Sequence, residues 1–431
     1  MVDPAIDIDV DLDVQEILLA ASQHDIPQLR RLIRGNETSG NPANVKDPET
    51  GYSPLHAAIA ACEPDEEEEE EEHEPPVNGG APNGVEPENK QATEHESMIR
   101  SGVQTVKFLL QEGAIWNDLD LNNETPGCIA RRLGFTELYE MIVDAGVRAE
   151  LLLNRLDGYE QLSDDEDEME EDEEQQRGGS GAAQTAEAEA VPELVDAAAA
   201  SSTAPAAAAA EPHVTNSRYL NSDLTFQNDR LLDQDQNGVM MAWESDIMAR
   251  SAKKLLPTPG LRVLNVGHGM GIVDGFLHEQ SPASHHIIEA HPEVVAEMKR
   301  KGWHEKPGVT IHEGRWQDIV PGLVAQGEMF DAIYYDTFAE SYADFREFFT
   351  EQVIGLLDQE GKWSFFNGMG ADRQISYDVY QKVAEMDLFE AGFDVEWEEI
   401  NVPKLEGEWN GVRRPYWMID DYRLPLCKYM D

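Results

Sequence analysis

The chain has 431 residues, a length that suggests about two to three domains, and 41% of them are hydrophobic, enough for packed cores. Its 86 acidic and 32 basic residues leave a formal charge of −54, which argues against a direct nucleic-acid binder or a protein of anionic membrane surfaces. Three cysteines do not suggest a disulfide framework, the first residues lack the pattern of a secretory signal, and no apolar run reaches the ~18 residues of a membrane helix. We therefore expect an intracellular protein with no membrane contact.

The N-terminal part of the chain, residues 10–157, carries the pattern of a helical repeat. Residues 50–58, TGYSPLHAA, are close to the Thr-Pro-Leu-His-x-Ala signature of ankyrin repeats, in which a turn leads into a helix. We expect that helix to begin at Pro54, with Ser53 as its N-cap. A degenerate copy around Pro126 follows 72 residues later (126 − 54). That spacing corresponds to one ankyrin period of about 33 residues plus an insertion.

We place the insertion at about 62–99, because this stretch is rich in acids and its removal joins two helical halves of one repeat. Residues 17–33 predict an opening helix pair, and residues 135–146 predict a closing helix. We therefore predict an all-α module of about three ankyrin-like repeats, in preference to a generic helical bundle. Arrays of this kind present binding surfaces, so the module implies a protein partner.

Acidic and alanine-rich segments separate this module from the remainder of the chain. Ten of the twelve residues 63–74 are acidic, as are ten of the eleven residues 164–174. Such runs repel themselves and cannot bury apolar area, so we expect them to be disordered. We predict a linker over residues 158–212, after which a second domain spans residues 213–431.

A glycine-rich loop is the first candidate ligand-binding motif in this second domain. The apolar run 262–266 is typical of a buried parallel strand, and Gly267, Gly269 and Gly271 follow it directly. Glycine is needed where the backbone turns sharply and must approach a ligand closely. Eighteen residues after Gly271 (289 − 271), Glu289 lies near the end of a second strand, where a carboxylate can bind ribose hydroxyls.

Further apolar runs predict the rest of an α/β sheet. The strands are expected at 287–291, 309–312, 330–335 and 362–366, with helices between them that include 292–301 and 344–357. A final pair of runs, 395–402 and 416–420, predicts an antiparallel hairpin at the edge of the sheet. Polar residues follow the strands, at the edge where doubly wound sheets bind ligands.

The spacing of the glycines indicates the cofactor. Gly-x-Gly-x-Gly differs from the wider Gly-x-Gly-x-x-Gly of dinucleotide binders, which favours S-adenosylmethionine over NAD. Trp316 and Gln317, after the third strand, could enclose and hydrogen-bond an adenine. The histidines do not have the spacing of metal ligands, so we expect no metal.

Five segments resemble guanidinoacetate methyltransferase, in the same order along the chain. They are MMAWESDIM at 240–248, RVLNVGHGMGIVD at 262–274, IIEAH at 287–291, EGRWQD at 313–318 and IYYDT at 333–337. With the ankyrin-like repeats in front, the whole chain resembles the fungal type IV protein arginine methyltransferases, which methylate the δ-nitrogen of arginine. The resemblance implies a class I, Rossmann-like methyltransferase domain, S-adenosylmethionine as co-substrate, protein substrates that include a ribosomal protein, and a cytoplasmic and nuclear location.

The same resemblance implies roles for individual residues. Glu244 and Asp336 correspond to the carboxylates that bind the guanidino group. The cofactor contacts that it implies lie in the glycine loop, at strand ends and on one helix: Met248, Gly267, His268, Gly269, Met270, Gly271, Ile272, Val273, Glu289, Ala290, His291, Trp316, Gln317 and Asp336. An aromatic residue of the entry segment also contacts the cofactor in that family, and Tyr219 is the best match, with Phe226 as the alternative. The chain departs from the family at His268, where the relative has an aromatic residue, and at Gly271, where it has alanine.

Two carboxylates suit this chemistry, because protonated arginine has no nucleophilic lone pair and must lose a proton as the new bond forms. Carboxylates can both aim the planar guanidinium and accept that proton. Two other hypotheses stay open: a small-molecule guanidino methyltransferase, and an ankyrin scaffold with a decayed methyltransferase fold. An NAD dehydrogenase is less favoured than either. The predicted protein-binding module favours a protein substrate, and the intact site residues speak against decay.

Overall fold

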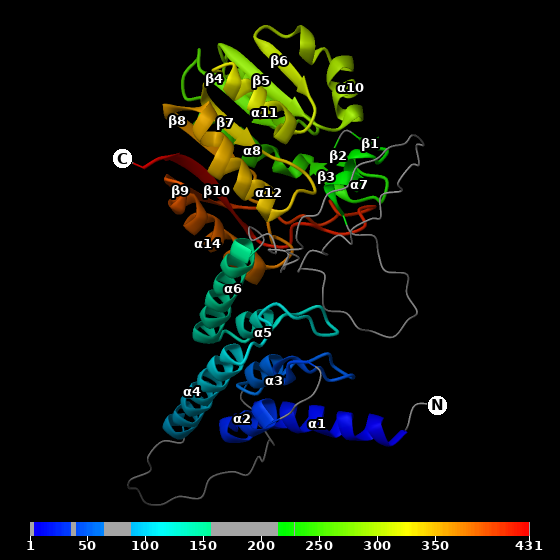
Figure 1. Cartoon of the computed structure of the whole chain (residues 1–431), viewed down its shortest axis with the longest axis vertical. Coiled ribbons are helices and arrows are strands. Elements are labelled where there is room, and N and C mark those ends of the chain that lie inside the picture. Colours follow the sequence, from blue (N-terminus) through cyan, green and yellow to red (C-terminus); the bar gives the residue numbers. More distant parts are fainter. Residues whose placement is uncertain (1–3, 36–39, 64–87, 157–213, 228, 431) are drawn as a thin grey trace, which may run out of the picture. The chain divides into compact units, whose positions relative to one another are not determined.

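The computed structural model describes the chain except for residues 1–3, 36–39, 64–87, 157–213, 228 and 431, which are grey in Figure 1. The described residues up to Leu152 and from Val214 onward pack as one unit. The acid run at 164–174, the linker predicted at 158–212 and nearly all of the run at 63–74 lie outside the described residues. The predictions for these segments therefore stay predictions.

The described N-terminal residues are helical, as the sequence predicts. The helices are α1 (Pro4–Ser22), α2 (Ile26–Gly35), α3 (Pro54–Ala60), α4 (Glu88–Gln111), α5 (Pro126–Arg132) and α6 (Thr136–Leu156). Ser53 is the N-cap of α3, and its Oγ lies 2.8 Å from Nδ1 of the buried His56. Thr125 caps α5 in the same manner, because its Oγ1 accepts the backbone N–H of Cys128 at 3.2 Å. The two caps confirm the predicted helix starts, while the ankyrin-like repeat itself stays a prediction.

One predicted helix boundary in this part needs correction. Helix α4 begins at Glu88, inside the stretch 62–99 in which we place the insertion, and the insertion itself stays a prediction. The closing helix expected at 135–146 continues to Leu156 as α6. Within the part of the chain that the structure describes, no helix is long and apolar enough to span a membrane.

A seven-stranded sheet forms the core of the C-terminal part (Figure 1). Its strands are β4 (Arg262–Val266), β5 (Ser284–Glu289), β6 (Val309–Glu313), β7 (Phe330–Tyr335), β8 (Leu357–Phe365), β9 (Phe393–Asn401) and β10 (Asp421–Tyr429), in the spatial order β6-β5-β4-β7-β8-β10-β9. The first five in this order run parallel, and β10 is antiparallel to both β8 and β9. The central strands β4 and β7 are buried apolar runs, as parallel strands covered on both faces must be.

The last strand lies elsewhere than the sequence predicts. The run at 416–420 is not a strand but part of the connection between β9 and β10, and the partner of β9 is 421–429. Pro425 explains the error, because a proline inside a run argues against an interior strand. Here Pro425 lies opposite Trp397 of β9, and its carbonyl accepts a hydrogen bond from Oγ of Ser364 in β8 at 2.6 Å.

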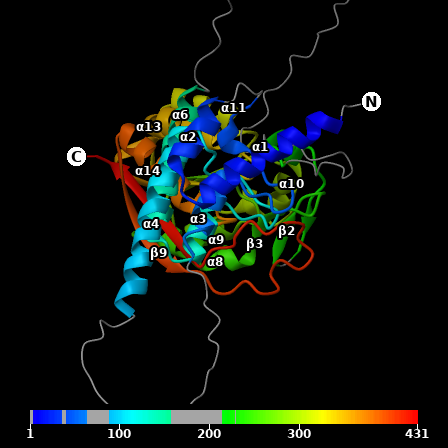
Figure 2. The ribbon, with the colours of Figure 1, turned by 90° about the horizontal axis from the view of Figure 1, so that it is seen from below.

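Helices flank this sheet. They are α8 (Ser245–Leu255), α9 (Ile272–Glu279), α10 (Pro292–Arg300), α11 (Trp316–Ala325), α12 (Tyr342–Glu347), α13 (Val353–Leu356) and α14 (Gln374–Glu390). α8 and α9 lie side by side (Figure 2), while α10 and α11 contact β5 and α14 contacts β9. The single helix predicted at 344–357 is divided, because a π-helical turn at Phe348–Gln352 separates α12 from α13. The alternation of strands and helices confirms the predicted α/β class for this part.

A small sheet and a short helix precede β4. Helix α7 (Asn216–Leu220) is followed by the antiparallel strands β1 (Thr225–Phe226), β2 (Arg230–Leu232) and β3 (Gly238–Met241). Directly after β3, a helical turn at Ala242–Glu244 leads into α8. This arrangement carries the predicted segment 240–248 from a strand into a helix, with Glu244 at the junction.

Helix α14 also packs against the N-terminal helices. A Cβ atom added at Gly127 of α5 would lie 2.7 Å from Cγ1 of Ile375 in α14, so only glycine allows this approach without rearrangement. The hydroxyl of Tyr139 in α6 donates a hydrogen bond to Oδ2 of Asp378 in α14 at 2.6 Å. One hydrophobic cluster therefore contains residues from both segments of the unit.

Candidate active site

The glycine loop between β4 and α9 has the conformation that its sequence requires. Gly267, Gly269 and Gly271 have φ angles of +94°, +53° and +80°, which side chains other than glycine rarely adopt. A Cβ atom at Gly267 would lie 1.9 Å from the backbone oxygen of Asp336. The loop therefore needs glycine both for its turn and for its close contact with the end of β7.

Glu289, at the end of β5, holds this loop in place. Its Oε2 accepts the backbone N–H groups of His268 at 2.9 Å and Gly269 at 3.3 Å, and its Oε1 accepts the N–H of His291 at 2.7 Å. A carboxylate offers about four lone-pair positions, so three backbone bonds leave about one for a ligand. Glu289 thus acts as the support of the loop and as a candidate acceptor for a ribose hydroxyl.

A buried trio of ionisable side chains lies behind the loop. Oδ2 of Asp274 lies 2.6 Å from Nδ1 of His268, and its Oδ1 lies 2.8 Å from Nε2 of His285. Burial tends to raise the pKa of Asp274, but the two histidines outweigh that effect and lower the pKa to about 2. His268 is therefore held from both ends, by Asp274 at its ring and by Glu289 at its backbone.

A first pocket lies in front of the loop, at the carboxyl ends of β4 and β5. Seven of the predicted site residues line it: Tyr219, Gly267, Gly269, Glu289, Ala290, Trp316 and Asp336. The ring of Tyr219 packs against His291 and Phe338, each with a centroid distance of 4.9 Å. Aromatic walls, a glycine backbone and a carboxylate are the groups that an adenosine with its ribose requires, so the residues fit S-adenosylmethionine.

The other predicted cofactor residues do not reach the wall of this pocket. Met248 and Val273 are fully buried in the hydrophobic core beneath it, and the ring of Phe226 packs at the edge of that core. The remaining predicted residues are also absent from the lining of this pocket: His268, Met270, Gly271, Ile272, His291 and Gln317. Their contribution is support: His291 caps α10, for example, and its Nε2 lies 3.1 Å from the backbone oxygen of Tyr219.

Glu340 is a residue that the sequence analysis missed. Its carboxylate accepts a hydrogen bond from Nε1 of Trp316 at 3.0 Å and another from the hydroxyl of Tyr335, and it lies 3.5 Å from Nε2 of Gln317. The N–H groups predicted to face adenine therefore meet this carboxylate. The sequence offered only a weak signal for Glu340, because an acid four residues after the aspartate at a strand end is not a known motif.

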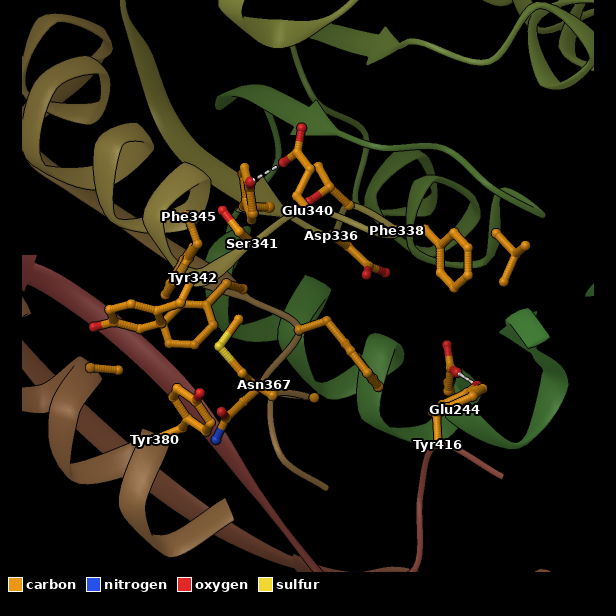
Figure 3. Close-up of a pocket in the computed structure, with 18 of the residues that line it drawn as sticks. Glu244, Asp336, Phe338, Glu340, Ser341, Tyr342, Phe345, Asn367, Tyr380 and Tyr416 are labelled. Carbon is orange, nitrogen blue, oxygen red and sulfur yellow. Dashed lines mark hydrogen bonds between the residues drawn. The ribbon is translucent and has the colours of Figure 1, made fainter. Parts of the chain in front are cut away.

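A second pocket, with a cavity volume of about 220 Å³, adjoins the first. The two share a wall formed by Val239, Asp336, Thr337, Phe338 and Glu340. Glu244 and Asp336 both line the second pocket, so the structure brings together the two predicted guanidino-binding carboxylates (Figure 3). Asp336 is thus the predicted residue that faces both cavities.

The two carboxylates differ in their partners. Oε1 of the buried Glu244 accepts a hydrogen bond from the hydroxyl of Tyr416, in the connection between β9 and β10. Oδ2 of Asp336 is buried and has no hydrogen-bond partner among the described residues. Tyr416 was expected in a strand and its role was missed, because nothing local marks a tyrosine that reaches a residue 172 positions earlier in the chain.

Burial and mutual repulsion raise the pKa values of both acids. Burial raises the pKa of Glu244 well above its usual range, and the charge of Asp336 raises it further. Burial, with the charges of Asp274 and Glu289, raises the pKa of Asp336 to about 7. Two neighbouring carboxyls of this kind bind a cation or a proton strongly, because either one relieves the repulsion.

Among the described residues of the second pocket, no basic side chain is present that could pair with the two carboxyls. The described residues that line the second pocket include three acids, Glu244, Asp336 and Glu340, and no lysine, arginine or histidine. No cluster of three or more histidine, cysteine, aspartate or glutamate side chains that could hold a metal ion occurs among the residues that the structure describes. The charge of the second pocket therefore favours a cationic group that donates hydrogen bonds, and this group would lie next to a ligand in the first pocket.

Comparison with known proteins identifies the family. The sequence pattern of guanidinoacetate N-methyltransferases matches residues 216–406, which include all residues that line the two pockets except Tyr416. Proteins named protein arginine N-methyltransferase 2 are 77% identical in Emericella nidulans and 75% identical in Aspergillus oryzae, and each comparison covers 100% of both chains. The protein of that name from Neurospora crassa is 46% identical over 97% of this chain and 96% of its own. The chain therefore belongs to the protein arginine N-methyltransferase 2 family.

Proposed function

We propose that this chain transfers a methyl group from S-adenosylmethionine to the δ-nitrogen of an arginine side chain in a protein substrate. The observation that carries the proposal is the shared wall: Asp336 faces both pockets, and with Glu244 it forms an acidic end that accepts one cation. The choice of the δ-nitrogen rests on the resemblance to type IV enzymes. A ribosomal protein is the substrate that this resemblance favours.

The carboxylates would perform two tasks. The guanidinium of arginine is always protonated and planar, and two carboxylates can grip it through paired hydrogen bonds and fix the direction of the attacking nitrogen. That nitrogen must lose a proton as its bond to carbon forms, and a carboxyl with a raised pKa is a suitable acceptor. Tyr416 would hold Glu244 in the required orientation.

S-adenosylmethionine supplies an electrophilic methyl group when bound in the first pocket. Glu289 would accept a hydrogen bond from its ribose, and the backbone at Gly267 and Gly269 would approach it without steric hindrance. Tyr219 and Trp316 would cover its apolar surfaces. The residues of the chain thus exclude water and position both reactants on either side of Asp336.

A small-molecule guanidino substrate is less well supported. Guanidinoacetate carries a carboxylate next to its guanidino group, and a buried carboxylate without a cationic partner is costly. The described wall of the second pocket offers three acids and no such partner. An arginine within a polypeptide has no carboxylate at this distance, so the charge of the pocket favours it.

The N-terminal helices would then dock the protein substrate. Support comes from the ankyrin-like signature at residues 50–58 and from the confirmed helix starts at Pro54 and Pro126. A decayed methyltransferase fold, the non-catalytic alternative, would not bind S-adenosylmethionine, so calorimetry with this ligand separates the two hypotheses.

The decisive experiment uses S-adenosylmethionine with a labelled methyl group. The purified full chain is incubated with extract from cells that lack the enzyme, and the labelled protein is hydrolysed to amino acids. We expect δ-monomethylarginine, and loss of the label with Glu244→Gln. Label in ω-methylarginine alone would contradict the assigned nitrogen, and label in a free guanidino compound alone would favour the small-molecule enzyme.

A further inference from the structure

The second pocket extends well beyond its two carboxylates. Glu244 and Asp336 lie towards one side of it, and Tyr342, Phe345 and Tyr380 lie on the other (Figure 3). An apolar cavity of about 150 Å³ can hold benzene, which has six heavy atoms, and this pocket has a cavity volume of about 220 Å³. A guanidinium with one methylene group has five heavy atoms. The far end of the pocket therefore has room for part of another group.

The far end offers a largely apolar surface, because the hydroxyl groups of its side chains are already paired. The hydroxyl of Tyr342 donates to Oδ2 of Asp387 at 2.7 Å, and that of Tyr380 donates to Oε2 of Glu150 at 3.1 Å. Oγ of Ser341 donates to Oδ2 of Asp344 at 2.7 Å. Apart from the amide of Asn367, which lies beside Tyr380 (Figure 3), the side chains of this end present mainly ring and aliphatic carbon to the cavity, including that of Met369 and Ala384.

The rings of this end are fixed by their surroundings. Phe345 packs on Phe365 with a centroid distance of 4.7 Å, and Tyr342 lies 5.9 Å from Tyr380. Tyr342 and Phe345 are 8% and 7% exposed. A preformed apolar wall gains free energy when an apolar group covers it, and it penalises a polar group that finds no hydrogen-bond partner.

We propose that this apolar end, formed by Tyr342, Phe345, Met369, Tyr380 and Ala384, binds an apolar side chain of the polypeptide substrate within two residues of the target arginine. The inference rests on the proposed function. The supporting observation is that the acidic and apolar ends belong to one cavity, so a side chain near the arginine can reach the apolar end while the arginine occupies the acidic end. In an extended chain, side chains two residues apart point to the same side, about 7 Å from each other.

The test measures methylation of blocked nonapeptides that contain a single arginine in a glycine and serine background. Leucine, phenylalanine, glycine or aspartate is placed one or two residues before or after the arginine. With the full-length enzyme we expect leucine or phenylalanine at one of these positions to raise kcat/KM at least tenfold over glycine. A flat profile across glycine, leucine and phenylalanine would overturn the proposal.

Two variants then locate the effect in the pocket. Ala384→Phe, and the milder Ala384→Leu, would fill the apolar end, and we expect the advantage of the leucine peptide over the glycine peptide to shrink to less than twofold. Glu385→Phe adds the same ring at the next, exposed position of α14 and should leave the advantage unchanged. Affinity for S-adenosylmethionine and the melting temperature of each variant verify the fold.

The outcomes separate this proposal from the proposed function. If the peptides are methylated but both Ala384 variants keep the full preference for leucine, the subsite assignment is wrong and arginine methylation stands. If the wild-type enzyme methylates no arginine peptide and instead methylates free guanidino compounds, the proposed function fails, and the subsite proposal fails with it.

Discussion

Tyr416 donates its phenolic hydrogen to Oε1 of Glu244, and so joins the connection between β9 and β10 to the helical turn before α8. Glu244 is buried and Tyr416 is half-buried, and their hydrogen bond opposes the effect of burial on the pKa of Glu244. The orientation of Glu244, one of the two carboxylates proposed to bind the guanidino group, therefore depends on a residue from the last part of the chain.

Replacing Tyr416 by phenylalanine tests this dependence. A hydrogen bond to a charged group contributes about 1.5–3 kcal/mol, and about 1.4 kcal/mol corresponds to a factor of ten. We expect Tyr416→Phe to lower kcat/KM for an arginine peptide by roughly 10–100-fold, with unchanged affinity for S-adenosylmethionine. Tyr429→Phe, which removes a hydroxyl in β10 away from both pockets, is the control. Equal activity of the two variants would refute the role of Tyr416.

The two carboxylates should be individually essential. Glu244→Gln and Asp336→Asn keep the size of the side chains but remove the charges that hold the guanidinium and accept its proton. Each change should lower turnover on the order of 10²–10³-fold, as the loss of one preorganised electrostatic group does. The double variant should lose less than the product of the two effects, because both groups serve one guanidinium. Near wild-type turnover in both single variants would refute the guanidino mechanism.

The raised pKa of Asp336 predicts the pH dependence of activity. With a pKa of about 7 in the free enzyme, Asp336 is protonated in mildly acidic solution and cannot hold a cation as a carboxylate. The profile of kcat/KM, which reports free-enzyme ionisations, should rise with pH through about 7. Because Glu244 is coupled to Asp336, the rise belongs to the pair. Asp336→Asn should change the pH at which kcat/KM rises. A profile of kcat/KM that is flat from pH 5 to pH 9 would contradict the role of Asp336 as a carboxylate that binds the cation.

The same shift predicts how stability depends on pH. Between the ordinary pKa of 3.8 and about 7, folded Asp336 keeps its proton while the unfolded chain releases it. The folded state then binds more protons, so the contribution of Asp336 to the free energy of unfolding falls as the pH rises. Urea unfolding at pH 5 and pH 8 should show Asp336→Asn gaining stability over wild type at the higher pH. An equal difference at both values would exclude the shift.

Glu289 should affect both the ligand and the loop. Glu289→Gln replaces one acceptor oxygen by an amide that faces the backbone N–H groups of His268 and His291. We expect the affinity for S-adenosylmethionine to fall at least tenfold, together with a lower melting temperature of the ligand-free protein. Glu313→Gln, at the exposed end of the next strand, is the matched control. A loss of affinity below twofold in calorimetry would rule out the ribose role.

The elements with local signals could be predicted from the sequence. The strand at 262–266 and the strand at 330–335 coincide with β4 and β7, because a buried parallel strand must be a continuous apolar run. The glycines of the loop have the positive φ angles that their spacing suggested. Glu244 and Asp336, recognised through a resemblance, indeed line one pocket.

Features that depend on distant contacts could not be predicted. β10 contains Pro425, which disfavours a strand because it cannot donate a backbone hydrogen bond. The sequence shows this proline directly, but it does not show the pairing with β9 that stabilises the strand. Glu340 and Tyr416 act through partners that only the fold brings near. Met248 belongs to one of the segments that carry the resemblance, but it lies on the face of α8 that packs into the hydrophobic core. The sequence shows which chemistry is present more readily than which face a side chain takes.

The position of β10 in the sheet has a consequence for synthesis of the protein. Residues 421–429 lie between β8 and β9, so neither strand has its final neighbour until these residues have left the ribosome. During translation the nascent chain would hold the parallel half of the sheet with an exposed edge at β8, an arrangement that invites pairing with other chains. The complete seven-stranded sheet therefore requires residues 421–429, and a chain that lacks them would leave an edge of β8 unpaired.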